Sequence, residues 1–111
     1  MRISELSAKT QVSVHRLRRY EADGLIESQR LPNGYRVYDD KTVKHVNFIA
    51  MSREMGFSLL FIAEYLPRFK TGQLSAKDMI EAIHQRVAEI DQLVTEQKAL
   101  RKKTDRPHRV V

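Results

Sequence analysis

Four side chains that can carry a positive charge lie close together in residues 13–22, and they could bind an anionic polymer. A helix over this segment places one set of residues on a single face, at the i, i+3, i+4 and i+7 positions: His15, Arg18, Arg19 and Ala22. Arg16 extends that face near the start of the helix. A helix in the major groove of DNA presents its N-terminal residues to base edges, and a guanidinium can donate two hydrogen bonds to guanine. We therefore predict that His15, Arg16 and Arg19 read bases; the alternative is an exposed basic helix without a ligand.

The first 24 residues are expected to form two short helices. Their apolar positions suit this arrangement: Ile3, Leu6, Val12 and Leu17. The helices are predicted over about residues 4–10 and 13–22, with only a tight turn between them. Ser13 is suited to cap the second helix because its hydroxyl can accept from a free backbone N–H, and Gly24 is suited to end it. Two short helices joined in this way indicate a helix-turn-helix.

Residues 31–38 predict a small β-hairpin wing. An Asn-Gly pair suits a tight turn, and a short alternating strand follows it. The alternation puts Tyr35 and Val37 on one face of the strand, where we expect Tyr35 to pack on the core. Arg36 and Tyr38 share the other face, where a guanidinium and a phenol hydroxyl could contact phosphates. A wing directly after a helix-turn-helix is a winged-helix arrangement.

Six segments form a combined pattern over about residues 1 to 66. They are Ile3-Ser4-Glu5-Leu6, Val12-Ser13-Val14, Leu17-Arg18-Arg19-Tyr20-Glu21, Gly24-Leu25-Ile26, Asn33-Gly34-Tyr35-Arg36-Val37-Tyr38 and Met55-Gly56-Phe57-Ser58-Leu59. In order and spacing, this pattern resembles the MerR family of bacterial transcription regulators. The resemblance implies a mainly α fold, with a winged helix-turn-helix, two supporting helices and a long C-terminal helix that pairs antiparallel in a homodimer. The complete set of DNA-binding residues that we predict is Ser13, His15, Arg16, Arg18, Arg19, Tyr20, Arg36 and Tyr38.

The chain departs from the usual family pattern at three places. The family usually has glycine where this chain has Gln11, so the backbone of that turn must accept a side chain. It usually has an aromatic residue at the position of Arg19, so a tyrosine contact to the DNA backbone becomes an arginine contact to phosphate or base. It normally has acidic residues at the positions of Leu60 and Phe61. These apolar residues indicate either an additional dimer or partner contact, or a cover for the base of the C-terminal helix.

Three further helices are expected after the wing. The first runs from residue 39 or 40 to residue 55, and the next begins at its N-cap Ser58 and ends at Pro67, which cannot continue the hydrogen-bond ladder. The last is predicted over residues 75–103, because Ser75 is a suitable N-cap and an acid follows in the first turn. The chain is thus divided into a winged helix-turn-helix DNA-binding domain (1–69), a linker (70–74), a dimerisation helix (75–103) and an expected disordered basic tail (104–111).

The last predicted helix carries one apolar seam. Its members follow heptad spacing and form the predicted dimer interface: Met79, Ile80, Ile83, Val87, Ile90, Leu93 and Val94. About 29 residues give a rod of roughly 43 Å, so much of the seam would face water in a monomer. We therefore predict a homodimer rather than packing of the seam on its own domain. Two protomers would present two recognition helices about a two-fold axis, which predicts a pseudo-palindromic DNA site.

Composition excludes several kinds of chemistry. The 111 residues include 20 Lys and Arg against 14 Asp and Glu, so the protein is basic, and the positive charge lies mainly at the two ends of the chain. There is no cysteine, which excludes thiolate metal sites. The histidines are scattered, so we expect no metal and no cofactor: His15, His45, His84 and His108. No apolar run approaches the length of a membrane helix and no signal peptide is evident, so we expect a cytoplasmic protein.

The resemblance also implies a mechanism. Regulators of this type bind promoters whose two polymerase recognition elements are spaced too far apart, and the dimer distorts the DNA so that RNA polymerase can use them. Metal-sensing relatives use cysteines, and drug-binding relatives append a large C-terminal domain; this chain has neither, so its effector stays open.

Two other functions stay open at this point. One is an architectural or excisionase-like DNA binder, which the dimer seam argues against. The other is a protein-binding, chaperone-cofactor module, which the retained arginines argue against. An enzyme is not expected, because the sequence has no glycine-rich phosphate loop and no Ser-His-Asp set.

Overall fold

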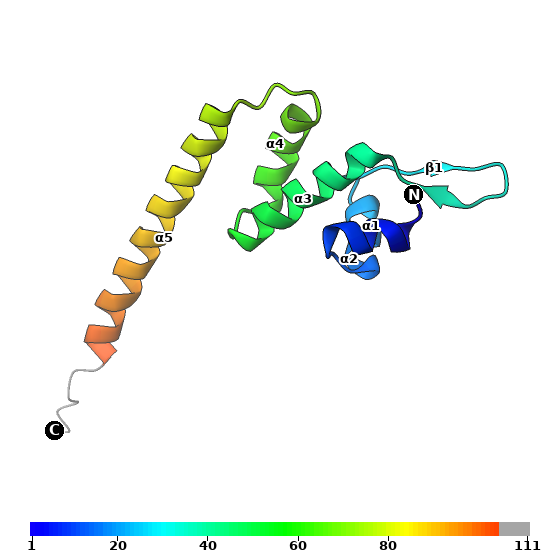
Figure 1. Cartoon of the computed structure of the whole chain (residues 1–111). Coiled ribbons are helices and arrows are strands. Elements are labelled where there is room, and N and C mark those ends of the chain that lie inside the picture. Colours follow the sequence, from blue (N-terminus) through cyan, green and yellow to red (C-terminus); the bar gives the residue numbers. More distant parts are fainter. Residues whose placement is uncertain (105–111) are drawn as a thin grey trace. The chain divides into compact units, whose positions relative to one another are not determined.

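The computed structural model describes residues 1–104, which form two units that divide after Leu74. In the first unit, α1 (Ile3–Thr10) and α2 (Val14–Ala22) precede a hairpin of β1 (Gln29–Arg30) and β2 (Arg36–Val37), followed by α3 (Asp40–Glu54) and α4 (Leu59–Lys70) (Figure 1). The second unit contains α5 (Ala76–Thr104). The predicted mainly α fold, a winged helix-turn-helix followed by a long helix, is confirmed. The predicted basic tail lies outside the described residues, except for Thr104, which ends α5.

The turn between α1 and α2 accepts a non-glycine residue in a left-handed conformation. Gln11 has φ +59°, and among residues 1–104 it is the only residue other than glycine with positive φ. Its backbone N–H donates to the Ser7 carbonyl at 2.9 Å, and its side-chain amide donates to the Ala8 carbonyl at 2.9 Å. After the turn, the Ser13 hydroxyl accepts from the Arg16 backbone N–H at 3.2 Å, which confirms the predicted N-cap of α2.

The core of the first unit lies where the inner faces of its helices meet. α3 packs against both α1 and α4, and α1 packs against α2. The side chains with the least exposure come from all four helices and from the segment after α2: Leu6, Leu17, Ile26, Val46, Ile49 and Ile62. Because α2 buries Leu17 in this core, the orientation of its exposed face is set by the apolar residues on its inner face.

The wing hairpin projects from the helices of this unit (Figure 1). Its strands are antiparallel, with Gln29 opposite Val37 and Arg30 opposite Arg36. At the tip, the Leu31 N–H donates to the Tyr35 carbonyl at 2.8 Å. The paired strands contain only two residues each, so the period-two alternation predicted for residues 35–38 holds over only part of that segment.

The predicted orientations of the two wing tyrosines are wrong. Tyr35 is 54% exposed, with the Arg2 guanidinium 4.5 Å from the centre of its ring, and does not pack on the core. Tyr38 is 4% exposed and does not offer a free hydroxyl. The reason is that the ladder ends at Val37 and the chain then turns toward α3. Beyond the ladder, the Tyr38 backbone pairs with Met1 through bonds of 2.7 and 2.8 Å, and its side chain enters the core.

The fourth helix does not end at Pro67 as expected, because α4 continues to Lys70. A proline removes its own N–H donor but leaves its carbonyl, which here accepts from the Thr71 N–H at 3.2 Å. Two tertiary contacts hold the last turn in place. Phe69 stacks on Phe48 of α3 with ring centres 4.6 Å apart, and the Lys70 ammonium donates to the Leu25 carbonyl at 2.7 Å.

The start of α4 carries the unusual apolar pair noted in the sequence. The Ser58 hydroxyl accepts from the Phe61 backbone N–H at 3.1 Å, which confirms this N-cap. Leu60 is 83% exposed. Phe61 instead lies between two aromatic rings, stacked on Phe57 at 3.9 Å and on Tyr65 at 4.3 Å. The two residues therefore differ in environment, and only Leu60 presents its side chain largely to solvent.

The described part of the second unit forms one long helix, α5, whose N-terminus is capped. The Ser75 hydroxyl accepts from the Asp78 N–H at 3.1 Å, and the Asp78 carboxylate accepts from the Ser75 N–H at 3.3 Å, which is a capping box. Five members of the apolar seam are 39% to 53% exposed: Ile80, Val87, Ile90, Leu93 and Val94. Across residues 1–104, the helices are all too short or too polar to span a membrane.

Candidate nucleic-acid interface

The exposed face of α2 brings together the predicted base-reading side chains. His15, Arg16 and Arg19 are all exposed, and Arg18 is exposed with them. Leu17 and Tyr20 are buried on the opposite side of the helix. This separation follows from the helical period: the apolar positions bury one side and leave three arginines and a histidine on the other. The result is a cationic surface at the N-terminal end of a helix, which suits binding to the major groove.

Arg16 is held in place by its own helix. Its Nη2 donates to the Tyr20 hydroxyl at 3.0 Å, and its guanidinium carbon lies 5.9 Å from the centre of the Tyr20 ring. Tyr20 is therefore mainly a buried support for Arg16, although it was predicted as a DNA-binding residue. The Ser13 hydroxyl oxygen accepts the capping bond and keeps its own proton, so it can still donate to a phosphate.

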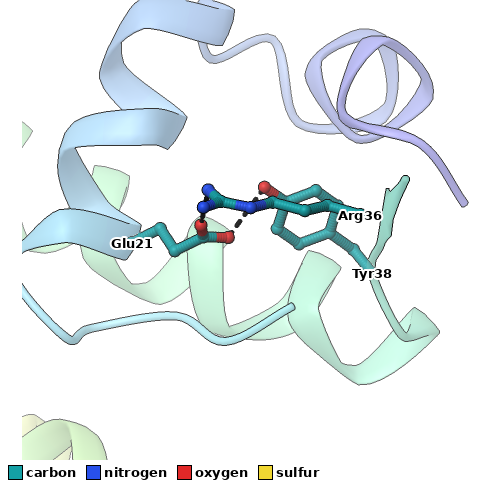
Figure 2. A network of polar contacts seen from close by, with 3 residues as sticks. All are labelled: Glu21, Arg36 and Tyr38. Atoms are coloured by element: carbon teal, nitrogen blue, oxygen red, sulfur yellow. Dashed lines mark hydrogen bonds and ion pairs between the residues drawn. The ribbon is translucent and has the colours of Figure 1, made fainter. Parts of the chain in front are cut away.

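A carboxylate at the end of α2 connects this helix to the wing (Figure 2). Glu21 uses both of its oxygens: Oε1 accepts from the Tyr38 hydroxyl at 2.8 Å, and Oε2 accepts from Arg36 Nη1. The Glu21 side chain is 16% exposed, whereas that of Arg36 is 49% exposed. Arg36 is thus anchored on one side and open to solvent on the other, as expected for a guanidinium that contacts phosphate.

Tyr38 has a different role from the one predicted. Burial, the hydrogen bond to Glu21 and the negative charge of that carboxylate raise the pKa of Tyr38 to about 12. Its hydroxyl proton is already donated to Glu21, so it cannot also be donated to a phosphate. The predicted phosphate contact by Tyr38 is therefore incompatible with this geometry.

Three residues of this interface were not among the predicted set. Glu21 belongs to one of the six sequence segments listed above. The sequence could have pointed to it, because it is an acidic residue on a strongly basic helix, next to the inward-facing Tyr20. Arg30 was missed because only the strand register places it opposite Arg36, where both residues are exposed. Arg2 was missed because its contact with the ring of Tyr35 joins the N-terminal end of the chain to the wing. The contacts of Glu21 and Arg2 join residues that are distant in sequence, and the pairing of Arg30 with Arg36 depends on how the hairpin closes.

The described residues show little that would hold a metal. Within residues 1–104, no three His, Cys, Asp or Glu side chains are grouped as metal ligands would be. His45 instead lies in a pocket of about 280 Å³ beneath the wing, with Lys41 and Lys70 among the other lining residues. Burial and then the charge of Lys70 lower the pKa of His45 below its ordinary value. His108 lies outside the described residues.

Comparisons with protein families agree with this geometry. Residues 1–68 match the family described as "MerR HTH family regulatory protein", and residues 43–105 match the family described as "MerR, DNA binding". The mercuric resistance operon regulatory protein of Bacillus cereus is 32% identical over 100 residues, which cover 89% of this chain and 76% of that protein. The nodulation protein NolA of a Bradyrhizobium strain is 37% identical over 87 residues. The match covers 78% of this chain but only 35% of NolA.

Solved structures resemble the fold over most of its length. The transcription regulator PbrR691 from Ralstonia metallidurans, solved in complex with lead(II), has a TM-score of 0.75 and 26% identity, and the match covers 94% of this chain and 82% of that one. HiNmlR, described as a MerR family regulator lacking the sensor domain and bound to promoter DNA, has a TM-score of 0.66. At 18% identity, with 92% of this chain and 78% of that chain covered, this second likeness concerns the fold alone. The family match over residues 1–68, together with the helix-turn-helix and wing described above, shows that the chain belongs to the MerR family of helix-turn-helix DNA-binding regulators.

Proposed function

We propose that this protein binds promoter DNA as a homodimer and regulates transcription by distorting the bound DNA. The observation that carries this proposal is the exposed basic face of α2, which is connected to a half-exposed wing arginine through Glu21. In this proposal, His15, Arg16 and Arg19 contact bases. Ser13, Arg18 and Arg36 contact phosphates and set the position of the helix in the groove. The protein acts in the cytoplasm, where bacterial promoter DNA and RNA polymerase are found, and it is not an enzyme.

The homodimer is inferred from α5. The five exposed seam residues named above form an apolar stripe along one side of a helix 29 residues long. Burying apolar surface is worth roughly 25 cal/mol per Å², so pairing two such stripes provides a driving force for association. The residues of the proposed interface remain those of the seam: Met79, Ile80, Ile83, Val87, Ile90, Leu93 and Val94.

The charges on α5 support antiparallel pairing. Near its N-terminal end Asp78 and Glu81 outnumber Lys77, whereas Arg101, Lys102 and Lys103 lie in its last turn. A parallel pair would place the two basic ends together, and like charges repel. An antiparallel pair places each basic end beside the acidic end of the partner. Two recognition helices related by the resulting two-fold axis would bind a pseudo-palindromic site.

The first test is selection of bound duplexes from a random DNA pool at near-physiological salt, where non-specific attraction is weakened. We expect an inverted repeat with fixed half-site spacing. Recovery of a site without symmetry would contradict dimeric recognition. No enrichment at all would favour the architectural or protein-binding alternatives, and DNA bending assays would then separate these two.

The second test places a charge in the seam. Ile90→Asp is expected to give a monomer with poor affinity for the selected site, because an aspartate in a paired seam would be desolvated without a partner. Ala88→Asp is the matched control, since it introduces the same charge at an exposed position outside the seam. Sedimentation equilibrium gives the oligomeric state of both variants. An Ile90→Asp variant that remains a dimer would show that the interface lies elsewhere.

A further inference from the structure

Glu21 is the point at which α2 and the wing are bonded to each other. Its carboxylate receives one hydrogen bond from Arg36 on β2 and another from Tyr38, which lies one residue beyond that strand. These partners are 15 and 17 residues away in sequence, and they lie on the element that α2 must be positioned against. The Tyr38–Met1 backbone bonds and the buried Tyr38 ring hold the base of the wing, and the Glu21 carboxylate adds a direct polar connection between the base-reading helix and Arg36 of the wing (Figure 2).

The wing needs such an anchor because its own structure is weak. The ladder consists of two residue pairs, and isolated two-stranded hairpins are marginally stable at best. One of those pairs sets Arg30 opposite Arg36, and like charges directly opposite each other are destabilising. The Glu21 carboxylate offsets the charge of Arg36 and so removes part of this repulsion. Without the carboxylate, the hairpin has both a short ladder and an unbalanced pair of guanidinium groups.

The geometry leaves Arg36 able to act on DNA while Glu21 holds it. One nitrogen of the guanidinium donates to Glu21, and a guanidinium has five N–H donors in all. The side chain is 49% exposed, so donors remain available to a phosphate oxygen. A guanidinium fixed by a carboxylate on one side loses less conformational freedom when it binds an anion on the other.

We propose that Glu21 is a positioning residue for DNA recognition. It fixes the wing relative to α2, so that the wing contacts the flanking phosphates when the α2 side chains contact the correct bases. This inference rests on the proposed interface of α2 and the wing. The carboxylate also repels phosphates, so it lowers affinity for DNA in general while it raises affinity for the correct site. Its net effect is therefore a gain in specificity.

The test is Glu21→Gln in the full-length protein, measured on the selected site and on random duplex. Glutamine can still accept from Tyr38 through its carbonyl oxygen, but it loses the charged bond to Arg36. We expect affinity for the selected site to fall by roughly 3- to 10-fold, the range of one ordinary hydrogen bond, because Glu21 acts on the DNA only through Arg36, while affinity for random duplex stays equal or rises. Glu64→Gln on α4 is the control, because it makes the same charge change at an exposed carboxylate of another helix.

Two further measurements separate positioning from simple destabilisation. The first compares Arg36→Ala with the double variant that also carries Glu21→Gln. The ratio of affinities for the selected site and random duplex should be the same in both, because Glu21 acts through Arg36. Hydroxyl-radical footprinting of Glu21→Gln should lose protection at the phosphates under the wing and keep the protection from α2. A variant with lower thermal stability and equal losses on both duplexes would overturn the proposal, as would a specificity ratio equal to that of Glu64→Gln. If the unaltered protein gave no protection under the wing, the proposed interface itself would fail.

Discussion

The turn before the recognition helix provides a quantitative test of how backbone conformation determines stability here. Gln11 has φ +59°, in the left-handed region that glycine adopts without steric cost. For other residues this region costs roughly 1–2 kcal/mol. Gln11→Gly should therefore relieve strain in the folded protein, and it should leave the helix-turn-helix geometry unchanged.

Two opposing contributions reduce the gain. Glycine gives the unfolded chain more conformational freedom, which costs about 0.5–1 kcal/mol. The substitution also removes the hydrogen bond from the Gln11 amide to the Ala8 carbonyl, which is exposed and is worth about 0.5 kcal/mol. Taking the upper part of the strain range, we expect a net stabilisation of roughly 0.5 kcal/mol. In a unit of this size that raises the melting temperature by roughly 2–4 °C.

Thermal and urea unfolding monitored by circular dichroism measure this change, with Gln11→Ala as the matched control. Alanine keeps the positive φ and loses the side-chain bond, so it should destabilise the protein by about 0.5 kcal/mol. The expected order of stability is glycine, then glutamine, then alanine. If alanine and glycine variants were equally stable, the strain of the left-handed conformation would be no larger than the entropy cost of glycine, and the expected order of stability would be refuted.

Three other predictions concern DNA contacts and pH. Arg36→Ala should weaken binding to all duplexes and flatten the salt dependence by about one phosphate contact, with a somewhat larger loss on the selected site because Glu21 acts through Arg36. Arg16→Ala or Arg19→Ala should relax sequence preference at individual base positions. Equal losses on specific and random duplexes for all three variants, in fluorescence anisotropy titrations, would contradict the assignment of base readout. Because the pKa of Tyr38 is raised to about 12, the folded protein holds this proton more tightly than the unfolded chain, so its stabilising contribution should be complete below pH 10 and lost as pH rises toward 12. Urea unfolding of Tyr38→Phe should lack this alkaline loss, and a parallel decline in both proteins would show that other groups cause it. The lowered pKa of His45 gives the opposite pH dependence: the contribution of His45 to stability is complete above about pH 6.5 and falls on acidification. An NMR titration in which His45 titrates at or above its ordinary pKa would contradict this assignment.

Local sequence rules were sufficient for the elements of this fold. Hydroxyl N-caps at Ser13 and Ser58 were predicted from residue type alone, and both accept the expected backbone N–H. The spacing of apolar residues also predicted that α2 would bury Leu17 and expose its arginines. These features depend on backbone groups and side chains within about one helical turn of each other. Short-range geometry is nearly the same in every protein, so residue type and spacing can predict it.

The errors arose where a residue's environment depends on distant parts of the chain. Pro67 did not end its helix, because Phe69 stacks on Phe48 of another helix. The orientations of Tyr35 and Tyr38 depended on where the strand ladder stops, which is a property of the paired strands and not of one alternating segment. In both cases tertiary contacts outweighed a local preference, which is worth about 3 kcal/mol for a proline inside a helix and about 1 kcal/mol for strand propensity.

The amino-acid sequence by itself determined which helix carries the cationic face, because helical periodicity and side-chain charge are intrinsic to the segment. Only the tertiary structure decided how that helix is joined to the wing. Glu21 meets Arg36 across 15 residues, and it does so because the core of α1, α2 and α3 brings the two segments together. The pairing of two distant polar groups depends on the closure of the intervening chain, and the free energy for that closure comes from apolar burial elsewhere in the unit.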